Sequence, residues 1–181
     1  MFSRGASGFT LAEVLVGLLL LAIGVMGAVA MQGKAQRTRL DSQLMSQALH
    51  VASSLGERMQ ANALQLDTYL SYRYDGALDG APIVPQALCF DGVACDSAQL
   101  AAFDLFETSQ SLYAAFPGGR ISVCHDGSVL DAGTKALAWQ CDGNASAPVT
   151  IKIGWEGRKG KAKQAPDGPR LALPLPVRSA P

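Results

Sequence analysis

The sequence predicts an α+β fold in which one long N-terminal helix packs on a small antiparallel β-sheet. Two helical patterns and one strand pattern predict it. An apolar run without charge extends from Val14 to Gly33, and an amphipathic pattern without proline continues it to Leu66. Beyond Leu66, repeated Asp-Gly turn dipeptides separate short segments of alternating apolar residues, which is typical of antiparallel strands. We therefore expect a helix over about residues 9–66 and a globular α+β domain over residues 67–181.

The charges of the 181-residue chain cancel overall but are unevenly distributed. Residues 1–66 hold five basic against three acidic side chains, residues 67–142 hold three against ten, and residues 143–181 hold seven against two. An argument from basic or acidic character must therefore be made for one segment at a time.

The apolar run is long enough to cross a membrane, because the twenty residues from 14 to 33 span roughly 30 Å as a helix. A plain signal anchor or a cleaved secretory peptide is the simplest explanation. A secretory peptide, however, carries its small-residue cleavage site after the apolar core, whereas Ala6, Ser7 and Gly8 precede it here. Glu13 lies almost at the start of the run, and an acid within a membrane is unfavourable and usually marks a function.

A cut between Gly8 and Phe9 would give Glu13 a partner. The new amino group of Phe9 would lie one helical turn from Glu13, at positions i and i+4. A neighbouring copy of the helix would offer its amine to this carboxylate, and such a pair is much stronger in apolar surroundings than in water. We therefore expect Glu13 to set the register between helices in an assembly.

The stretch GFTLAEVLVGLLLLAIG, residues 8–24, carries a family resemblance. It resembles the type III signal sequence of type IV pilins and pseudopilins, in which a short polar leader ends in glycine before Phe-Thr-Leu, any residue and glutamate. The matching positions are Gly8, Phe9, Thr10, Leu11 and Glu13. The resemblance implies a pilin fold that is preceded by a leader peptide, residues 1–8.

The same resemblance implies how the chain is processed and where it goes. A prepilin peptidase would cleave after Gly8 on the cytoplasmic side, and Phe9 would then be N-methylated. The helix would anchor the subunit in the inner membrane in a single pass, with the C-terminal domain in the periplasm, before assembly into a pilus at the cell surface. Arg4 agrees with a cytoplasmic N-terminus by the positive-inside rule.

The second half of the predicted helix, about residues 34–66, is amphipathic. Its apolar residues recur at steps of three and four, namely Leu40, Leu44, Ala48, Val51, Leu55, Met59 and Leu66. This spacing gives the helix one face to bury. The helix also contains the glycines Gly17, Gly24, Gly27, Gly33 and Gly56. They either bend it or permit close packing, and the first three are spaced for contacts between membrane helices.

Residues 97–116 predict a second amphipathic helix in the globular domain. Leu100, Phe103, Phe106 and Leu112 lie at helical spacing. Ser97 is the expected cap at its start, and Pro117-Gly118 is the expected stop.

Three strands are predicted at residues 120–125, 149–155 and 170–177. Pro174 and Pro176 cannot donate ladder hydrogen bonds, so the last of these strands belongs at an edge of the sheet. Residues 135–141 are a candidate fourth strand.

The four cysteines, Cys89, Cys95, Cys124 and Cys141, all lie in the globular domain. In an exported chain this even number favours two disulfides formed in an oxidising compartment. Counting alone allows three pairings, and four reduced cysteines are the alternative. Local spacing favours Cys89 with Cys95 around the turn at Asp91-Gly92, and Cys124 with Cys141 around further Asp-Gly and Ala-Gly turns.

Residues 89–155 carry a second resemblance. The segment 95–105, Pro117-Gly118-Gly119, Cys124 and the strand at 149–155 are similar to the PilV family of minor pilins, the type IV pilus modification proteins. This resemblance implies a minor pilin that takes part in priming pilus assembly and in surface display, in a tip complex with other minor pilins. Its other partners would be the major pilin and the inner-membrane assembly platform.

The sequence gives little support to an enzyme. It holds no Cys-x-x-Cys pair, and His50 and His125 have no zinc spacing with neighbouring acids. We therefore expect no catalytic residue, no metal site and no cofactor.

Two other functions are alternatives to a minor pilin of this kind. A pseudopilin of a type II secretion system would share the leader and the helix. The basic stretch RKGKAK would contact nucleic acid, as in a DNA-binding minor pilin of an uptake pilus, through Arg158, Lys159, Lys161 and Lys163. Because no aromatic residues lie between these bases, the contact would be weak and salt-sensitive, so nucleic acid is not the expected partner.

Overall fold

The computed structural model describes residues 10–90, 94–157 and 168–175. The chain divides into two compact units, Met1–Gln43 and Leu44–Pro181. Helix α1 (Leu11–Ala61) contributes residues to both units. The fold is α+β, with this long helix and a four-stranded antiparallel sheet, as predicted.

The first unit consists, in its described part, of the N-terminal residues of α1. Among the described residues, α1 is the one helix long and apolar enough to cross a membrane, and none of its apolar window is buried by the rest of the chain. Leu18, Leu19, Leu20 and Leu21 are all exposed. A run of exposed leucines on a single chain indicates that something outside the chain covers them.

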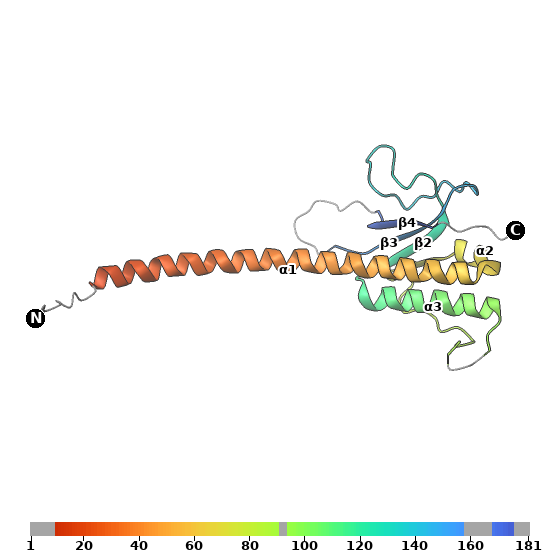
Figure 1. Ribbon diagram of the computed structural model, residues 1–181, viewed down its shortest axis with the longest axis horizontal. Helices are drawn as coiled ribbons and strands as arrows, with labels where there is room; N and C mark the ends of the chain where they lie inside the picture. The colour runs from red at the N-terminus through yellow and green to blue at the C-terminus, as the bar shows by residue number, and fades with distance from the viewer. Residues whose placement is uncertain (1–9, 91–93, 158–167, 176–181) are drawn as a thin grey trace, which may run out of the picture. The chain divides into compact units, whose positions relative to one another are not determined.

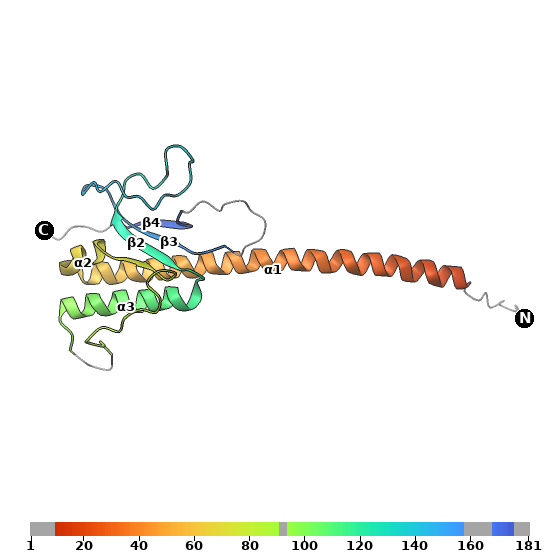
Figure 2. The ribbon, with the colours of Figure 1, turned by 180° about the vertical axis from the view of Figure 1, so that it is seen from behind.

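The second unit is built around the last turns of α1, which lie between the sheet and helix α3 (Ser97–Ala115) in both views (Figures 1 and 2). Ala48, Ala52, Leu55 and Met59 are fully buried in the core. Three of these positions were predicted from the helical spacing, and Ala52 extends the same face. Leu40, expected on this face, is 46 % exposed and belongs to the first unit.

The helix ends at Ala61, earlier than the predicted end at Leu66. Asn62 leaves the helical conformation, at φ −119° and ψ 49°, and is buried. Its side-chain amide donates a 2.7 Å hydrogen bond to the carbonyl of Ser97. A 3₁₀ turn (Ala63–Gln65) and the short helix α2 (Leu66–Leu70) follow. The break arises because Asn62 bonds to another helix, which a pattern of apolar residues does not reveal.

Helix α3 occupies the predicted segment but is capped by a different residue. Asp96, not Ser97, is the cap: its Oδ1 accepts the Gln99 amide at 2.8 Å, and the Gln99 side chain accepts the Asp96 amide at 3.0 Å. This reciprocal pair is a capping box. The helix ends at Ala115 because Phe116 precedes a proline and is extended.

The buried face of α3 is more polar than predicted. Ala101 and Leu112 are fully buried, but Asp104 and Thr108 share that face, whereas Leu100 is 38 % exposed. Asp104 is stabilised there by the Tyr69 hydroxyl at 2.7 Å and by the Arg58 guanidinium, also at 2.7 Å. The three side chains connect α1, α2 and α3.

The ionisation of this cluster follows from its contacts. Burial opposes the charge of Arg58, but hydrogen bonds to Glu107 and Asp104 outweigh it and raise the pKa of Arg58. Burial, together with the hydrogen bond to Asp104, raises the pKa of Tyr69. The Arg58 guanidinium is therefore charged and the Tyr69 phenol neutral at neutral pH.

The sheet has the order β1-β2-β3-β4, with every neighbouring pair antiparallel. Strands β2 (Arg120–His125), β3 (Val149–Gly154) and β4 (Leu171–Leu175) confirm the three predicted strands, and β4 lies at an edge as its prolines require. Residue 177 lies outside the described residues.

One strand was missed and one candidate strand was wrong. Strand β1 (Arg73–Asp75) was missed, because three residues are too few to show alternation. Residues 135–141 form no strand and contribute one isolated bridge, from Leu137 to Leu130. This segment instead belongs to a loop that covers the sheet.

The two faces of the sheet are covered differently. Ile121, Val123, Ile151 and Ile153 belong to the hydrophobic core. Gly56 of α1 lets β4 approach closely, since a Cβ there would lie 2.8 Å from the Leu175 side chain. Loop 126–148 covers the opposite face of β3, whose residues are all buried.

Candidate assembly site and the disulfide loop

Glu13 lies in the first turn of α1 and is exposed. Its Oε2 accepts the backbone amide of Thr10 at 3.0 Å and the Thr10 hydroxyl at 3.1 Å. The Thr10 hydroxyl in turn accepts the Glu13 amide at 3.3 Å. Thr10 and Glu13 therefore form a capping box at the start of the helix.

The capping box gives Glu13 a role within a single chain that the sequence analysis missed. The signal was present in the sequence motif Thr-x-x-Glu directly before an apolar run, which is typical of a capping box. A carboxylate at this end also interacts favourably with the helix dipole. The acid thus caps the start of the helix within a single chain.

Gly8 and Phe9, the predicted cleavage site, lie outside the described residues, as does Arg4. The pairing of the Phe9 amine with Glu13 therefore stays a prediction. The structure places Glu13 next to Thr10, the residue that directly follows Phe9 in the chain.

The glycines of the apolar half of α1 have open surroundings. A Cβ built at Gly17, Gly24 or Gly27 would meet no atom of the chain within 4 Å. Within a single chain these glycines therefore relieve no close contact. Their predicted role in packing against other helices stays a prediction.

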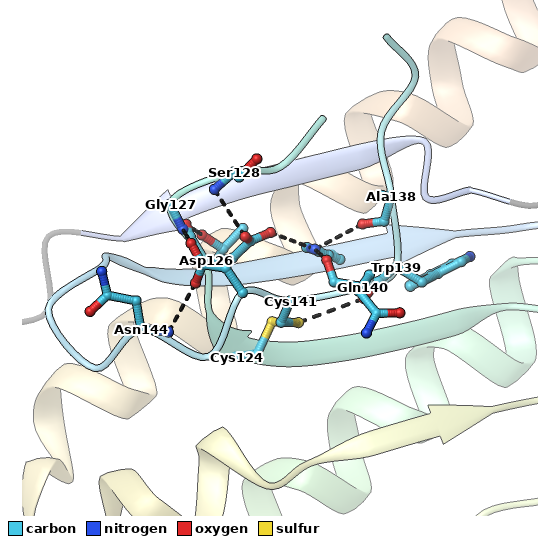
Figure 3. The surroundings of a disulfide bond; sticks show 12 residues. Cys124, Asp126, Gly127, Ser128, Ala138, Trp139, Gln140, Cys141 and Asn144 are labelled. Carbon is cyan, nitrogen blue, oxygen red and sulfur yellow. Dashed lines mark hydrogen bonds and ion pairs between the residues drawn. A yellow bond between two sulfur atoms is a disulfide. The ribbon is translucent and has the colours of Figure 1, made fainter. Parts of the chain in front are cut away.

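The structure joins Cys89 to Cys95 and Cys124 to Cys141, with S–S distances of 2.05 and 1.98 Å. All four cysteines are paired. This is the local pairing that the spacing favours. The second bond ties the end of β2 to loop 126–148, as Figure 3 shows.

A buried ion pair holds the same loop. Lys152 of β3 and Asp126 have fully buried side chains, and the Lys152 Nζ lies 2.5 Å from Asp126 Oδ2. The Nζ also donates to the carbonyl oxygens of Ala138 at 2.8 Å and Gln140 at 2.7 Å. Figure 3 shows Asp126, Ala138 and Gln140 around the disulfide of the same loop.

The ion pair sets the charge of Asp126. Burial alone would raise its pKa, but the hydrogen bond from Lys152 and that from the Ser128 amide outweigh burial and lower the pKa of Asp126 below its ordinary value. Asp126 is therefore ionised at neutral pH. A lysine inside an apolar strand gave no sequence signal of its partner, because Asp126 and the two carbonyls lie in an irregular loop without a regular spacing to Lys152.

The other predicted residues have structural surroundings or lie outside the described part. His125 Nδ1 lies 2.7 Å from the Ala147 carbonyl, and no group of three or more histidine, cysteine or acidic side chains in the described residues is arranged to hold a metal ion. The four bases considered for nucleic acid lie in residues 158–167, outside the described residues.

Comparison with protein families gives two adjacent matches. Residues 3–29 match the prokaryotic N-terminal methylation motif, and residues 30–106 match the Tt1218-like family, described as type IV pilin Tt1218. No curated protein and no solved structure shows significant similarity to the chain.

The two matches point to one class of protein, the type IV pilins. Over residues 30–106 the chain is similar to the Tt1218-like family of type IV pilins. The fold agrees, since a long N-terminal helix joins a small antiparallel sheet. Most of the stretch that resembles PilV, from residue 107 onward, lies beyond both matches.

Proposed function

We propose that the protein is a minor pilin of the PilV type. A prepilin peptidase removes residues 1–8, Phe9 is N-methylated, and the subunit waits in the inner membrane with its C-terminal domain in the periplasm. It then joins other minor pilins in a tip complex that primes pilus assembly at the assembly platform and precedes the major pilin. The role is structural and not enzymatic.

One observation carries this proposal: a methylation motif over residues 3–29 leads into an apolar helix that the chain itself leaves uncovered. A membrane covers such a helix before assembly, and neighbouring pilin helices cover it afterwards. An apolar helix of this length is unfavourable when it is exposed to water.

Glu13 has two successive roles in the proposal. In the precursor it caps α1 through Thr10. After cleavage, the Phe9 amine of a neighbouring subunit competes for the same carboxylate. In the apolar core of a filament an unpaired carboxylate is strongly unfavourable, so pairing selects one register of the helices.

Two substitutions separate capping from charge. Glu13→Gln keeps the capping box, since glutamine serves equally at this position, but removes the charge. Thr10→Val removes the hydroxyl of the cap and keeps the charge. We expect both variants to be cleaved normally, and only Glu13→Gln to lose incorporation, by at least about tenfold if one buried charge pair is lost. Immunoblots of sheared pili against membranes measure the ratio.

The opposite pattern contradicts the pairing. If Glu13→Gln enters pili like the wild type while Thr10→Val does not, capping and not charge is what assembly requires. Gly8→Leu is the control for processing, because a bulky side chain at the cut site should leave the leader attached.

A pseudopilin of a type II secretion system is the second candidate, because the methylation motif does not by itself distinguish the two systems. Deletion of the gene discriminates between them. Loss of surface pili and twitching with intact secretion supports the minor pilin, and loss of secretion with normal pili supports the pseudopilin.

A further inference from the structure

Three basic side chains directly follow the apolar run of α1, and we call them the basic collar. They are Lys34, Arg37 and Arg39, and all three are exposed. Within the described residues none of them takes part in an ion pair or donates a side-chain hydrogen bond. The described part of the chain therefore gives the collar no partner of its own.

The charge of the basic collar is not balanced by nearby acids. In residues 10–43, the described part of the first unit, the acidic side chains are Glu13 and Asp41. Glu13 lies at the opposite end of the apolar run. Asp41 lies one turn beyond Arg37, with no ion pair between these two described residues. The collar together with Asp41 thus keeps a net positive charge, from three bases and one acid.

The position of the basic collar along α1 matches the headgroup layer of a membrane. The uncharged run of residues 14–33 spans roughly the 30 Å hydrocarbon core. Arg37 lies about 4.5 Å and Arg39 about 7.5 Å further along the helix axis than Lys34. The headgroup layer on each side of the core is about 5–7.5 Å thick. When the run spans a membrane, all three bases therefore lie at the depth of the lipid headgroups.

A groove on the surface of α1 changes from apolar to basic in the direction away from the membrane. It is lined by Met31, Lys34, Ala35, Thr38, Arg39 and Ser42. Met31 continues the apolar run, and Lys34 and Arg39 follow it along the groove. The Thr38 hydroxyl between them donates to the Lys34 carbonyl at 3.3 Å. A phospholipid has the same order, with an apolar chain that leads to an anionic headgroup.

The directions of the three bases favour a lipid layer over a single protein partner. Around the helix, Arg37 is turned about 60° from Lys34 to one side and Arg39 about 140° to the other. The bases thus spread over more than half of the circumference, whereas a packed partner helix contacts one face. A second copy of this chain is also a poor partner, because Asp41 is the one acid in residues 14–43.

We propose, resting on the membrane anchorage in the proposed function, that the basic collar binds the headgroups of anionic phospholipids in the outer leaflet of the inner membrane. Basic residues are less common on that side of a membrane helix, so three of them together are not explained by topology. Each Lys or Arg beside an anionic membrane surface strengthens binding by about fivefold. The headgroups hold the subunit at a fixed depth until it leaves the membrane.

The test uses the full-length chain in phosphatidylcholine vesicles that contain a trace of spin-labelled lipid. Electron paramagnetic resonance separates lipids in contact with the protein from free lipids, and so measures the preference for phosphatidylglycerol over phosphatidylcholine. We expect a preference of at least about threefold in about 0.1 M salt. It should decrease in about 1 M salt, because the Debye length falls from about 10 Å to about 3 Å.

Matched variants locate the binding. The triple variant Lys34→Gln, Arg37→Gln and Arg39→Gln should reduce the preference by at least about twofold, since three attractive charges are lost. Lys34→Arg with Arg37→Lys and Arg39→Lys keeps the charges and should keep the preference. Arg73→Gln with Lys135→Gln removes exposed charges from the second unit and should leave the preference unchanged.

Three results would overturn the proposal. The first is equal contact of the two lipids with the wild type. The second is an unchanged preference in the triple Gln variant; if that variant also fails to enter pili, the bases contact a neighbouring subunit instead. The third is loss of the preference on addition of about 10 mM inorganic phosphate at constant ionic strength, which would assign the collar to free phosphate.

Extraction of the vesicles with alkaline carbonate separates this result from the proposed function. A chain that stays in the vesicles without a lipid preference contradicts the role of the basic collar alone. A chain that carbonate removes contradicts the membrane anchorage, and the lipid binding with it.

Discussion

The two parts of helix α1 bury their apolar side chains by different means. Leu19 and Leu20 in the first unit are 61 % and 64 % exposed, whereas Leu55 and Met59 in the second are 1 % and 0 % exposed. The second part finds its partners in its own chain, from the sheet and from α3. The first part requires partners from outside, in a membrane or in a filament.

The difference also separates two kinds of sequence information. The first part is specified by composition, because any continuous apolar run satisfies a lipid or a neighbouring helix. The second part depends on particular residues, such as Asn62 at the helix end and Gly56 beneath Leu175. Substitutions should therefore affect folding of the second unit strongly and of the first unit hardly at all.

The largest effect is expected at Lys152. Lys152→Met leaves the carboxylate of Asp126 buried without its cation, which costs about 3–5 kcal/mol of unfolding free energy. Denaturant unfolding of the full-length chain in detergent measures the loss. Leu19→Ala in the first unit is the control and should leave that transition unchanged. A loss below about 1 kcal/mol in Lys152→Met would mean that the pair adds little.

The same pair predicts how stability depends on pH. The pKa of Asp126 is lowered in the folded chain, so its contribution is complete above the ordinary value of 3.8 and is lost as the pH falls through the lower folded pKa. Stability of the wild type should fall in this acidic range. In Asp126→Asn the fall should be smaller, and equal slopes in the two proteins would contradict the assignment.

A smaller effect is expected at Gly56. Gly56→Val forces a side chain against Leu175, where even a Cβ would lie at 2.8 Å, and should cost about 1–3 kcal/mol. Gly24→Val is the matched change in the first unit, where a Cβ meets no atom within 4 Å. It should leave unfolding of the second unit unchanged. Similar destabilisation by both would remove the contrast between the two parts.

The smallest effect is expected at the two helix caps. Asp96→Ala removes the capping box of α3 and should cost about 1 kcal/mol, while Ser97→Ala should cost less because Ser97 is not the cap. Thr10→Ala removes the corresponding hydroxyl in the first unit and should not alter thermal unfolding of the second. A larger loss in Ser97→Ala than in Asp96→Ala would contradict the capping assignment.

Much of the fold was predictable because regular patterns extend over many residues. Strands β2, β3 and β4 alternate in the sequence, and α3 lies between clear turn signals. Strand β1 was not predicted because its three residues are too few to show a strand pattern. It forms by pairing with β2. The cap of α3 was misplaced by one position because Asp96 and Ser97 are both good caps.

The candidate sites were also only partly predictable from the sequence. Glu13 was noticed because a charge at the head of an apolar run is conspicuous, but its bond to Thr10 became clear from the structure. The buried pair of Lys152 and Asp126 could not be predicted, because the two residues come from β3 and from the loop before it. Only the register of the sheet and the disulfide loop bring these side chains together.

The central claim is that the first part of α1 belongs to a processed and methylated filament subunit. The intact mass of the protein isolated from the membrane tests it most directly. We predict the mass of residues 9–181 with one added methyl group on Phe9 and without the four thiol hydrogens of its cysteines. A chain that retains residues 1–8, or one cut after the apolar run, would contradict the account.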